Sequence, residues 1–166
     1  MSTNFIKNID LAMEFLHKKG AFLTAKNGNT LNTMTISWGN IGFEWNRPIF
    51  TVLVRKSRYT HEIMENTNEF TISIPINESL KEALAYCGSK SGKNVDKFKE
   101  CNLTLKDGKS VSTPIIADCE LHYECKIVYK QDMNPELLCE DIKNSSYKTG
   151  DYHTIYYGEI VDCYKL

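Results

Sequence analysis

Residues 119–129 read Cys-Glu-Leu-His-Tyr-Glu-Cys-Lys-Ile-Val-Tyr, and this stretch decides the fold class. From 119 to 127 the odd positions are apolar and the even positions are polar or charged, so each set lies on one side of an extended chain. This alternation is typical of an antiparallel strand with one face in water. We therefore expect residues 114–129 to form such a strand, with His122 and Glu124 on its solvated face.

Further strand-sized runs surround this stretch. The expected strands are Phe22–Lys26, Leu31–Trp38, Ile49–Val54, Phe70–Ile74 and Tyr152–Tyr164, the last one bent at Gly158. Asn27-Gly28-Asn29 predicts a hairpin between the first two, and residues 39–47 are expected to form a loop. Short helices are expected at Asn4–Lys19, Tyr59–Asn66, Glu78–Cys87, Val95–Cys101 and Asn134–Lys143. Strands do not alternate with long helices, which favours a small antiparallel barrel over a doubly wound parallel sheet.

The length of 166 residues fits one domain, 1–166. The net charge of −1 argues against a nucleic-acid binder that depends on bulk positive charge. No run of 18 apolar residues predicts a membrane helix, and residues 1–9 carry no secretory signal pattern. We therefore expect a cytoplasmic protein that has no membrane or nucleic-acid partner and whose six cysteines, none in a C-x-x-C pair, are free thiols.

The densest basic cluster is Arg55-Lys56-Ser57-Arg58, where an expected strand runs into a helix. The start of a helix offers unpaired N–H groups, and cations and hydroxyls gathered there suit a small anion such as phosphate. A solvated loop is the alternative interpretation. The loop at residues 88–93 is not a phosphate-binding P-loop, because only three residues separate its glycines.

Two other segments are candidates for ligand contact. Small hydroxyls within Asn32–Trp38 would let a flat ligand lie against the strand with Trp38 as a wall, although a solvent-facing polar side explains them equally. His153 enters the last strand, as a proton donor, a polar wall or a half-buried structural residue. No nucleophile triad is visible, and His61-Glu62 lacks the second histidine of a zinc motif, so no metal site is expected.

In this order, the segments resemble the flavin reductase-like family of FMN-binding split-barrel proteins over nearly the whole chain. The segments that carry the resemblance are Asn32–Trp38, Arg47-Pro48, Arg55–Thr60, Phe70–Pro75, Ser91-Gly92-Lys93 with Asp96-Lys97-Phe98, and Gly150-Asp151-Tyr152-His153. The resemblance implies a six-stranded antiparallel Greek-key split β-barrel with FMN at a homodimer interface.

The resemblance also implies roles for individual residues. The flavin ring would lie along Asn32, Thr33, Met34, Thr35, Ile36, Ser37 and Trp38. The phosphate would be held by Arg55, Lys56, Ser57 and Thr60 and by the amides of Tyr59 and Thr60. From the next loop, Lys93 and the turn Asp96-Lys97-Phe98 would approach the flavin or its phosphate. His153 would be catalytic beside the flavin, although this chain reads Gly-Asp-Tyr-His where the family has Gly-Asp-His.

The implied function is an FMN-binding oxidoreductase of the flavin reductase type. It would pass reducing equivalents from NADH or NADPH through bound flavin to free flavin, ferric iron or a protein redox partner. No G-x-G-x-x-G fingerprint is present, so the nicotinamide would bind against the flavin. The alternatives are a flavoredoxin-like electron carrier without NAD(P)H activity, a non-enzymatic flavin-binding protein, and a barrel with no cofactor.

Overall fold

The chain is built around one large antiparallel sheet in the computed structural model, which describes residues 4–166. The strands are β1 (Ala21–Asn27), β2 (Thr30–Ile36), β3 (Gly39–Glu44), β4 (Arg47–Arg55), β5 (Glu69–Ile74), β6 (Leu105–Lys106), β7 (Ile115–Ile116), β8 (Leu121–Asp132) and β9 (His153–Lys165). The sheet has the order β2-β1-β5-β8-β9-β4-β3, and β6 pairs with β7 separately. Every pairing is antiparallel, which confirms the mainly β class.

The sheet has seven strands and is not closed, so the expected six-stranded barrel is wrong in strand count and closure. β2 and β3 are the two edges, and no pairing joins them within residues 4–166. The extra strand β3 lies in the region expected to be a loop. Trp45 and Asn46, with φ of 51° and 60°, form the turn that pairs Glu44 with Arg47. A two-residue turn of this kind needs positive φ at both positions, and tryptophan gives no signal for it.

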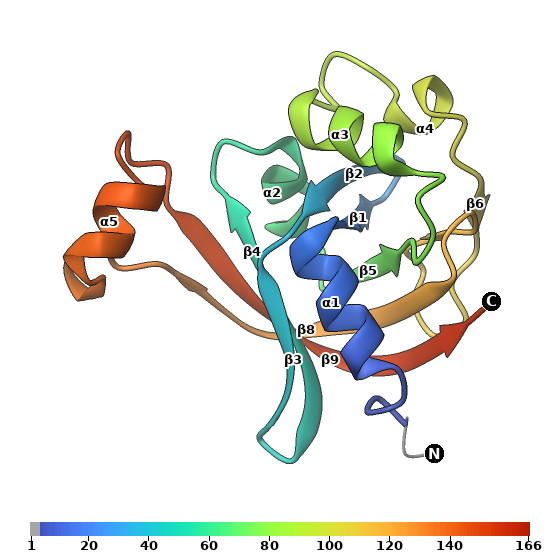
Figure 1. Ribbon diagram of the computed structural model, residues 1–166, viewed down its shortest axis with the longest axis horizontal. Coiled ribbons are helices and arrows are strands. Elements are labelled where there is room, and N and C mark those ends of the chain that lie inside the picture. The colour runs from blue at the N-terminus through green and yellow to red at the C-terminus, as the bar shows by residue number, and fades with distance from the viewer. Residues whose placement is uncertain (1–3) are drawn as a thin grey trace.

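All five expected helices are present with shifted ends. They are α1 (Ile9–Lys18), α2 (Tyr59–Met64), α3 (Lys81–Ser89), α4 (Lys97–Glu100) and α5 (Glu140–Ser146), with a 3₁₀ turn at Pro135–Leu137 before the last. In Figure 1, α5 stands apart from the other helices, on an excursion between β8 and β9. We call residues 133–152 the arm. Its helix α5 has no buried residue.

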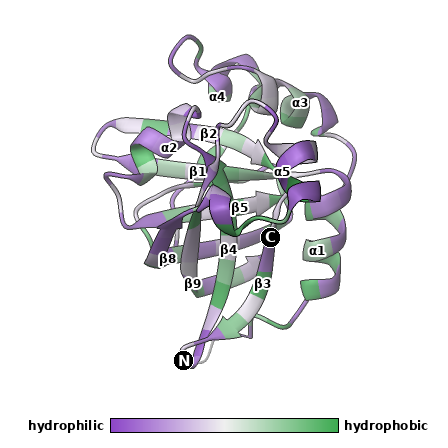
Figure 2. Cartoon of the chain, turned by 90° about the vertical axis from the view of Figure 1, so that its left-hand side faces the viewer, coloured by the Kyte–Doolittle hydropathy of each residue, from purple (hydrophilic) through white to green (hydrophobic). Residues whose placement is uncertain are grey.

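Two apolar clusters fix the helices to the sheet. The larger one joins the middle of the sheet to α1 through Leu16 and to α2 through Met64, around the fully buried Phe50 and Tyr123. The smaller one joins α3 to β1 around Phe22. In Figure 2 the hydrophobic colour is concentrated on the central strands, whereas α5 is mostly hydrophilic. The elements that carry the basic cluster and Asn32–Trp38 therefore rest on a packed core.

The polar face of β8 is buried, contrary to the solvated face expected from the alternation. Both His122 and Glu124 are fully buried, because the segment 103–117 crosses over this face. Glu124 accepts hydrogen bonds from the amides of Lys109 (2.8 Å) and Ser110 (2.6 Å) and from the phenol of Tyr164 (2.6 Å). A carboxylate buried in this way replaces its lost hydration with charge-assisted hydrogen bonds.

His122 is held in the same layer. Its Nε2 lies 2.9 Å from the carbonyl of Cys119, and its Nδ1 lies 3.1 Å from the hydroxyl of Ser73. Burial lowers the pKa of His122 to about 4. The alternation in the sequence thus located the strand correctly, but it could not show that an earlier loop covers its polar side.

At Gly158, where a bend was expected, the β8–β9 ladder is irregular. The β8–β9 register shifts between Ile127 and Tyr129, opposite this glycine. A Cβ at Gly158 would lie 2.5 Å from the ring of Phe70 and 2.8 Å from the Cβ of Cys125. Only glycine therefore fits at this irregularity of the ladder.

We predict that Glu124→Ala destabilises the fold strongly. Each buried donor left without an acceptor costs about 1–3 kcal/mol, and the substitution leaves at least two amides and one phenol in that state. The expected loss is about 3 kcal/mol or more, measured by urea denaturation. Glu136→Ala on the exposed arm is the control and should change stability by about 0.5 kcal/mol at most. Equal midpoints for the two variants would contradict this role of Glu124.

Candidate functional site

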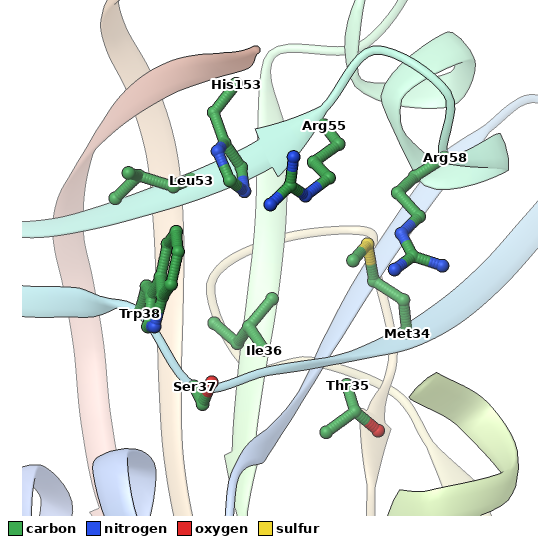
Figure 3. A pocket seen from close by; sticks show the side chains of 9 residues that line it. All are labelled: Met34, Thr35, Ile36, Ser37, Trp38, Leu53, Arg55, Arg58 and His153. Atoms are coloured by element: carbon green, nitrogen blue, oxygen red, sulfur yellow. The ribbon is translucent and has the colours of Figure 1, made fainter. Parts of the chain in front are cut away.

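Two adjoining hollows lie at the end of β2, where it meets β4 and the start of α2. The first has a volume of about 160 Å³ and is lined by Met34, Thr35, Ile36, Ser37, Trp38, Leu53, Arg55, Arg58 and His153 (Figure 3). The second, of about 90 Å³, is lined by Asn32, Met34, Ser57, Arg58, Tyr59, Thr60, Lys97 and residues 87–92. Met34 and Arg58 line both hollows, so the two lie next to each other.

The hydroxyls of Thr33 and Thr35 in β2 donate to backbone carbonyls, although Thr35, like Ser37, also lines the first hollow. Thr33 donates to the carbonyl of Leu23 at 3.2 Å, and Thr35 donates to the carbonyl of Leu84 in α3 at 2.6 Å. They satisfy backbone carbonyls of neighbouring elements instead of facing solvent. The apolar side chains of Met34 and Ile36 are directed into the first hollow in Figure 3.

The hydrogen bonds of Arg55 go to residues of the arm. Its guanidinium donates to the carbonyls of Asp151 (2.8 Å) and Ser146 (3.0 Å) and lies 5.1 Å from the ring centroid of Tyr147. In Figure 3 it also borders the first hollow beside His153. Arg55 therefore contributes positive charge to the hollow while its hydrogen bonds hold the arm in place.

The other residues of the basic cluster divide into two groups. Lys56 pairs with Asp132 at 2.6 Å and lines neither hollow. Ser57 lines the second hollow, but both its amide (3.1 Å) and its hydroxyl (2.7 Å) donate to the carboxylate of Asp151. Arg58, in contrast, makes no ion pair within residues 4–166 and faces both hollows. The cation best placed for a ligand in this cluster is therefore Arg58.

Lys97 brings a buried positive charge to the second hollow. It is 3% exposed, and its Nζ donates to the carbonyls of Thr33 and Cys87, each at 2.8 Å. No carboxylate pairs with it in the described part of the chain. Burial lowers the pKa of Lys97. A buried ammonium that is bonded only to carbonyls is well placed to receive an anion.

Of the remaining residues expected at the flavin or its phosphate, Lys93 and Phe98 line neither hollow, whereas Thr60 lines the second one. Lys93 pairs with Glu62 on the surface and lines neither hollow. Phe98 packs against the smaller apolar cluster. Thr60 is buried and accepts a hydrogen bond from the amide of Asn32 at 2.9 Å, which ties β2 to α2.

A glycine brings the loop after α3 close to β2. A Cβ at Gly92 would lie 2.0 Å from the side-chain oxygen of Asn32, so no other residue fits there. The backbone of residues 88–92 thereby forms one wall of the second hollow. Close approach of backbone to a ligand is a common use of glycine.

His153 lies in the first hollow between Trp38 and Arg55 (Figure 3). Its ring centroid is 5.4 Å from that of Trp38, and its Nδ1 is 2.6 Å from the hydroxyl of Tyr147. Burial, helped by the charge of Arg55, lowers the pKa of His153 to about 4. The imidazole is therefore neutral at pH 7, and it can offer a hydrogen bond to a ligand but no imidazolium proton.

Comparison with known proteins identifies the family. The model of the flavin reductase like domain matches residues 13–165. The chain belongs to the flavin reductase-like family. Flavoredoxin from Methanosarcina acetivorans is 25% identical with a TM-score of 0.70, over 89% of this chain and 68% of that one. An FMN-binding domain of a flavin reductase-like enzyme from Shewanella baltica has the same fold, with a TM-score of 0.68, 19% identity, and coverage of 95% and 74%.

A third relative is the high molecular weight rubredoxin of Moorella thermoacetica. It is 31% identical over 103 residues, which are 61% of this chain and 42% of that protein. The match thus covers less than half of the rubredoxin's length. The flavin reductase-like family, and the flavin-binding proteins within it, support flavin binding.

The sequence pointed to no individual role for three residues at or beside the two hollows, Arg58, Leu53 and Tyr147. Arg58 belonged to the recognised cluster, but its free direction is visible only in three dimensions. Leu53 was read as core, and Tyr147 had no motif around it. The local sequence carried a signal for Arg58 alone.

The residues that the structure describes contain no group of three potential metal ligands. None of their helices is long and apolar enough to cross a membrane. All six cysteines are free. Cys87 lines the second hollow, where burial raises the pKa of its thiol to about 12. It is therefore a protonated, weakly reactive thiol at neutral pH.

We predict a pH dependence of stability that comes partly from His153. An unfolded histidine binds a proton below about pH 6.5, whereas folded His153 stays neutral down to about pH 4. The unfolded state therefore binds more protons in this window, and stability falls as the pH drops from 6.5 to 4. The contribution reaches about 3 kcal/mol at pH 4. Urea denaturation should show a weaker pH dependence for His153→Gln than for the wild type, and identical profiles would contradict this.

Proposed function

We propose that the protein is an FMN-binding oxidoreductase of the flavin reductase type. It passes reducing equivalents from NADH or NADPH through the flavin to free flavin, ferric iron or a protein partner. One observation carries the proposal. An apolar and aromatic hollow adjoins a second hollow in which Arg58 and the buried Lys97 have no carboxylate partner. A flat ring joined to a phosphate has the matching polarity at its two ends.

The first hollow would receive the ring. Met34, Ile36 and Leu53 supply apolar contact, and Trp38 forms a wall that excludes water from one side. The bound flavin would supply the hydride and electron chemistry, and the protein would position and tune it. His153 remains neutral there and would offer a hydrogen bond to an acceptor atom of the ring.

The second hollow would receive the phosphate. Lys97 would supply a buried charge, and Thr60 a hydroxyl at the start of α2. Arg58, whose guanidinium donates to the carbonyl of Gly88 at 3.4 Å, would supply a second charge. The first amides of a helix have no partner within the helix, so those of Tyr59 and Thr60 are available as further donors. Lys56 pairs with Asp132, and Lys93 pairs with Glu62. Each lysine would have to break its ion pair to reach the phosphate.

An electron carrier without NAD(P)H activity is the second candidate. It is favoured by the 25% identity to a flavoredoxin and by the match to part of a high molecular weight rubredoxin. The low reactivity of the Cys87 thiol favours neither candidate, since both place the redox chemistry on the flavin.

An absorbance spectrum followed by anaerobic titration with NADH and NADPH separates these functions. We expect a flavin spectrum in the purified protein or after incubation with FMN, and bleaching by one of the two nucleotides with steady-state turnover. A flavin that only a ferredoxin-like or rubredoxin-like protein reduces would identify the carrier. A protein that acquires no flavin spectrum would refute both proposals.

A second copy of the chain would complete the site. Ligand pockets usually enclose about 300–1,000 Å³, more than these two hollows together provide. Trp38 is 46% exposed at the rim and would be covered by a partner. Sedimentation should therefore show a dimer, and a monomer that holds FMN with unchanged affinity would contradict it.

We predict that Arg58→Ala weakens FMN binding. A hydrogen bond to a charged group contributes about 1.5–3 kcal/mol, which corresponds to a loss of about 10- to 100-fold in affinity. Arg47→Ala is the matched control, because Arg47 is exposed and pairs with Glu159 away from both hollows. Fluorescence titration with FMN measures both variants. Equal dissociation constants would rule out the second hollow as the phosphate site.

A further inference from the structure

Tyr147 is a buried residue at the end of α5 that the proposed function leaves without a role. It is 4% exposed, although it belongs to an arm that is otherwise mostly exposed. Its ring stacks on that of Tyr152 at 4.9 Å and 22°, and the guanidinium of Arg55 lies 5.1 Å from its centroid. Tyr147 is therefore held on several sides, and its hydroxyl has a fixed direction.

The hydroxyl of Tyr147 is hydrogen-bonded to the ring of His153. Tyr147 Oη lies 2.6 Å from His153 Nδ1, and the two rings meet edge to face at 84°. Within residues 4–166 this is the only hydrogen bond of the phenol. A neutral histidine carries one N–H, so either the phenol donates to Nδ1 or an Nδ1–H donates to the phenol oxygen.

The burial of the phenol decides between these directions. If Nδ1–H donated, the phenol hydrogen would be buried with no acceptor among the described residues. A buried donor left without an acceptor costs about 1–3 kcal/mol, whereas an N–H on Nε2 faces the first hollow, so the phenol donates and Nδ1 accepts. The single proton of the imidazole is then on Nε2, the ring nitrogen left for the first hollow.

We propose that Tyr147 is a positioning residue that fixes His153 as the Nε2–H tautomer, so that the first hollow contains a neutral hydrogen-bond donor. The proposal about the ligand rests on the proposed function. Arg55 borders the same hollow, but two of its guanidinium nitrogens donate to Ser146 and Asp151. The N–H of His153 thus provides an oriented donor for a carbonyl oxygen or an unprotonated ring nitrogen of the ligand.

The test is a long-range ¹H–¹⁵N correlation spectrum of the full chain without added flavin, labelled at the histidine nitrogens. Comparison with His153→Gln assigns the signals. We expect the Nε2–H pattern in the wild type. In Tyr147→Phe we expect signals shifted towards a mixture of the two tautomers. An Nδ1–H pattern in the wild type would overturn the proposal, and that result does not depend on whether a variant folds.

Tyr152→Phe is the matched control. It removes a hydroxyl from the adjacent stacked ring, and that hydroxyl makes no hydrogen bond within residues 4–166. The control should keep the wild-type pattern. An unchanged His153 pattern in folded Tyr147→Phe, or equal shifts in both variants, would also overturn the proposal.

Titration with FMN then tests whether the oriented donor reaches the ligand. We expect Tyr147→Phe to bind FMN several-fold more weakly than Tyr152→Phe. Equal affinities would refute the contact between His153 and the ligand. If the wild type binds no FMN, the proposed function fails, while the tautomer spectrum still decides the role of Tyr147.

Discussion

The guanidinium of Arg55 joins the end of β4 to the arm, and the geometry of the site follows from this contact. Its two hydrogen bonds, to Ser146 and Asp151, fix the segment that returns from the arm to β9. The carboxylate of Asp151 then binds the amide and hydroxyl of Ser57, and His153 enters β9 directly opposite Arg55. The basic cluster, the start of α2 and the histidine of the first hollow are thus held by one set of contacts.

The charged side chains near the site differ in whether they form ion pairs. The chain is nearly neutral, and most of its surface lysines near the site pair with carboxylates, as Lys56 does with Asp132 and Lys93 with Glu62. Arg58 and Lys97 make no ion pair within the described residues, and both line the second hollow. An anion bound there would compensate a buried charge that the folded chain leaves uncompensated.

Local signals in the sequence predicted local structure well. Asn27-Gly28 predicted its hairpin, and the alternation at 119–127 predicted β8. Features that depend on distant segments were missed. The cover over His122 and Glu124 comes from an earlier segment, whose amides at residues 109–111 bond Glu124, and the turn at Trp45-Asn46 places a tryptophan at a positive φ, where it gives no signal. For the same reason the sequence could gather Arg55–Arg58 in one cluster but could not tell which of these cations pairs with a carboxylate and which faces a ligand.

The central claim is that the two adjoining hollows hold a flat ring in the first and a phosphate in the second. The affinities of the wild-type protein for FMN and for riboflavin, measured side by side by fluorescence titration, test it most directly. If Arg58 and Lys97 hold the phosphate, FMN should bind at least about tenfold more tightly than riboflavin, since each charge-assisted hydrogen bond contributes about 1.5–3 kcal/mol. Equal affinities for the two flavins would contradict the account.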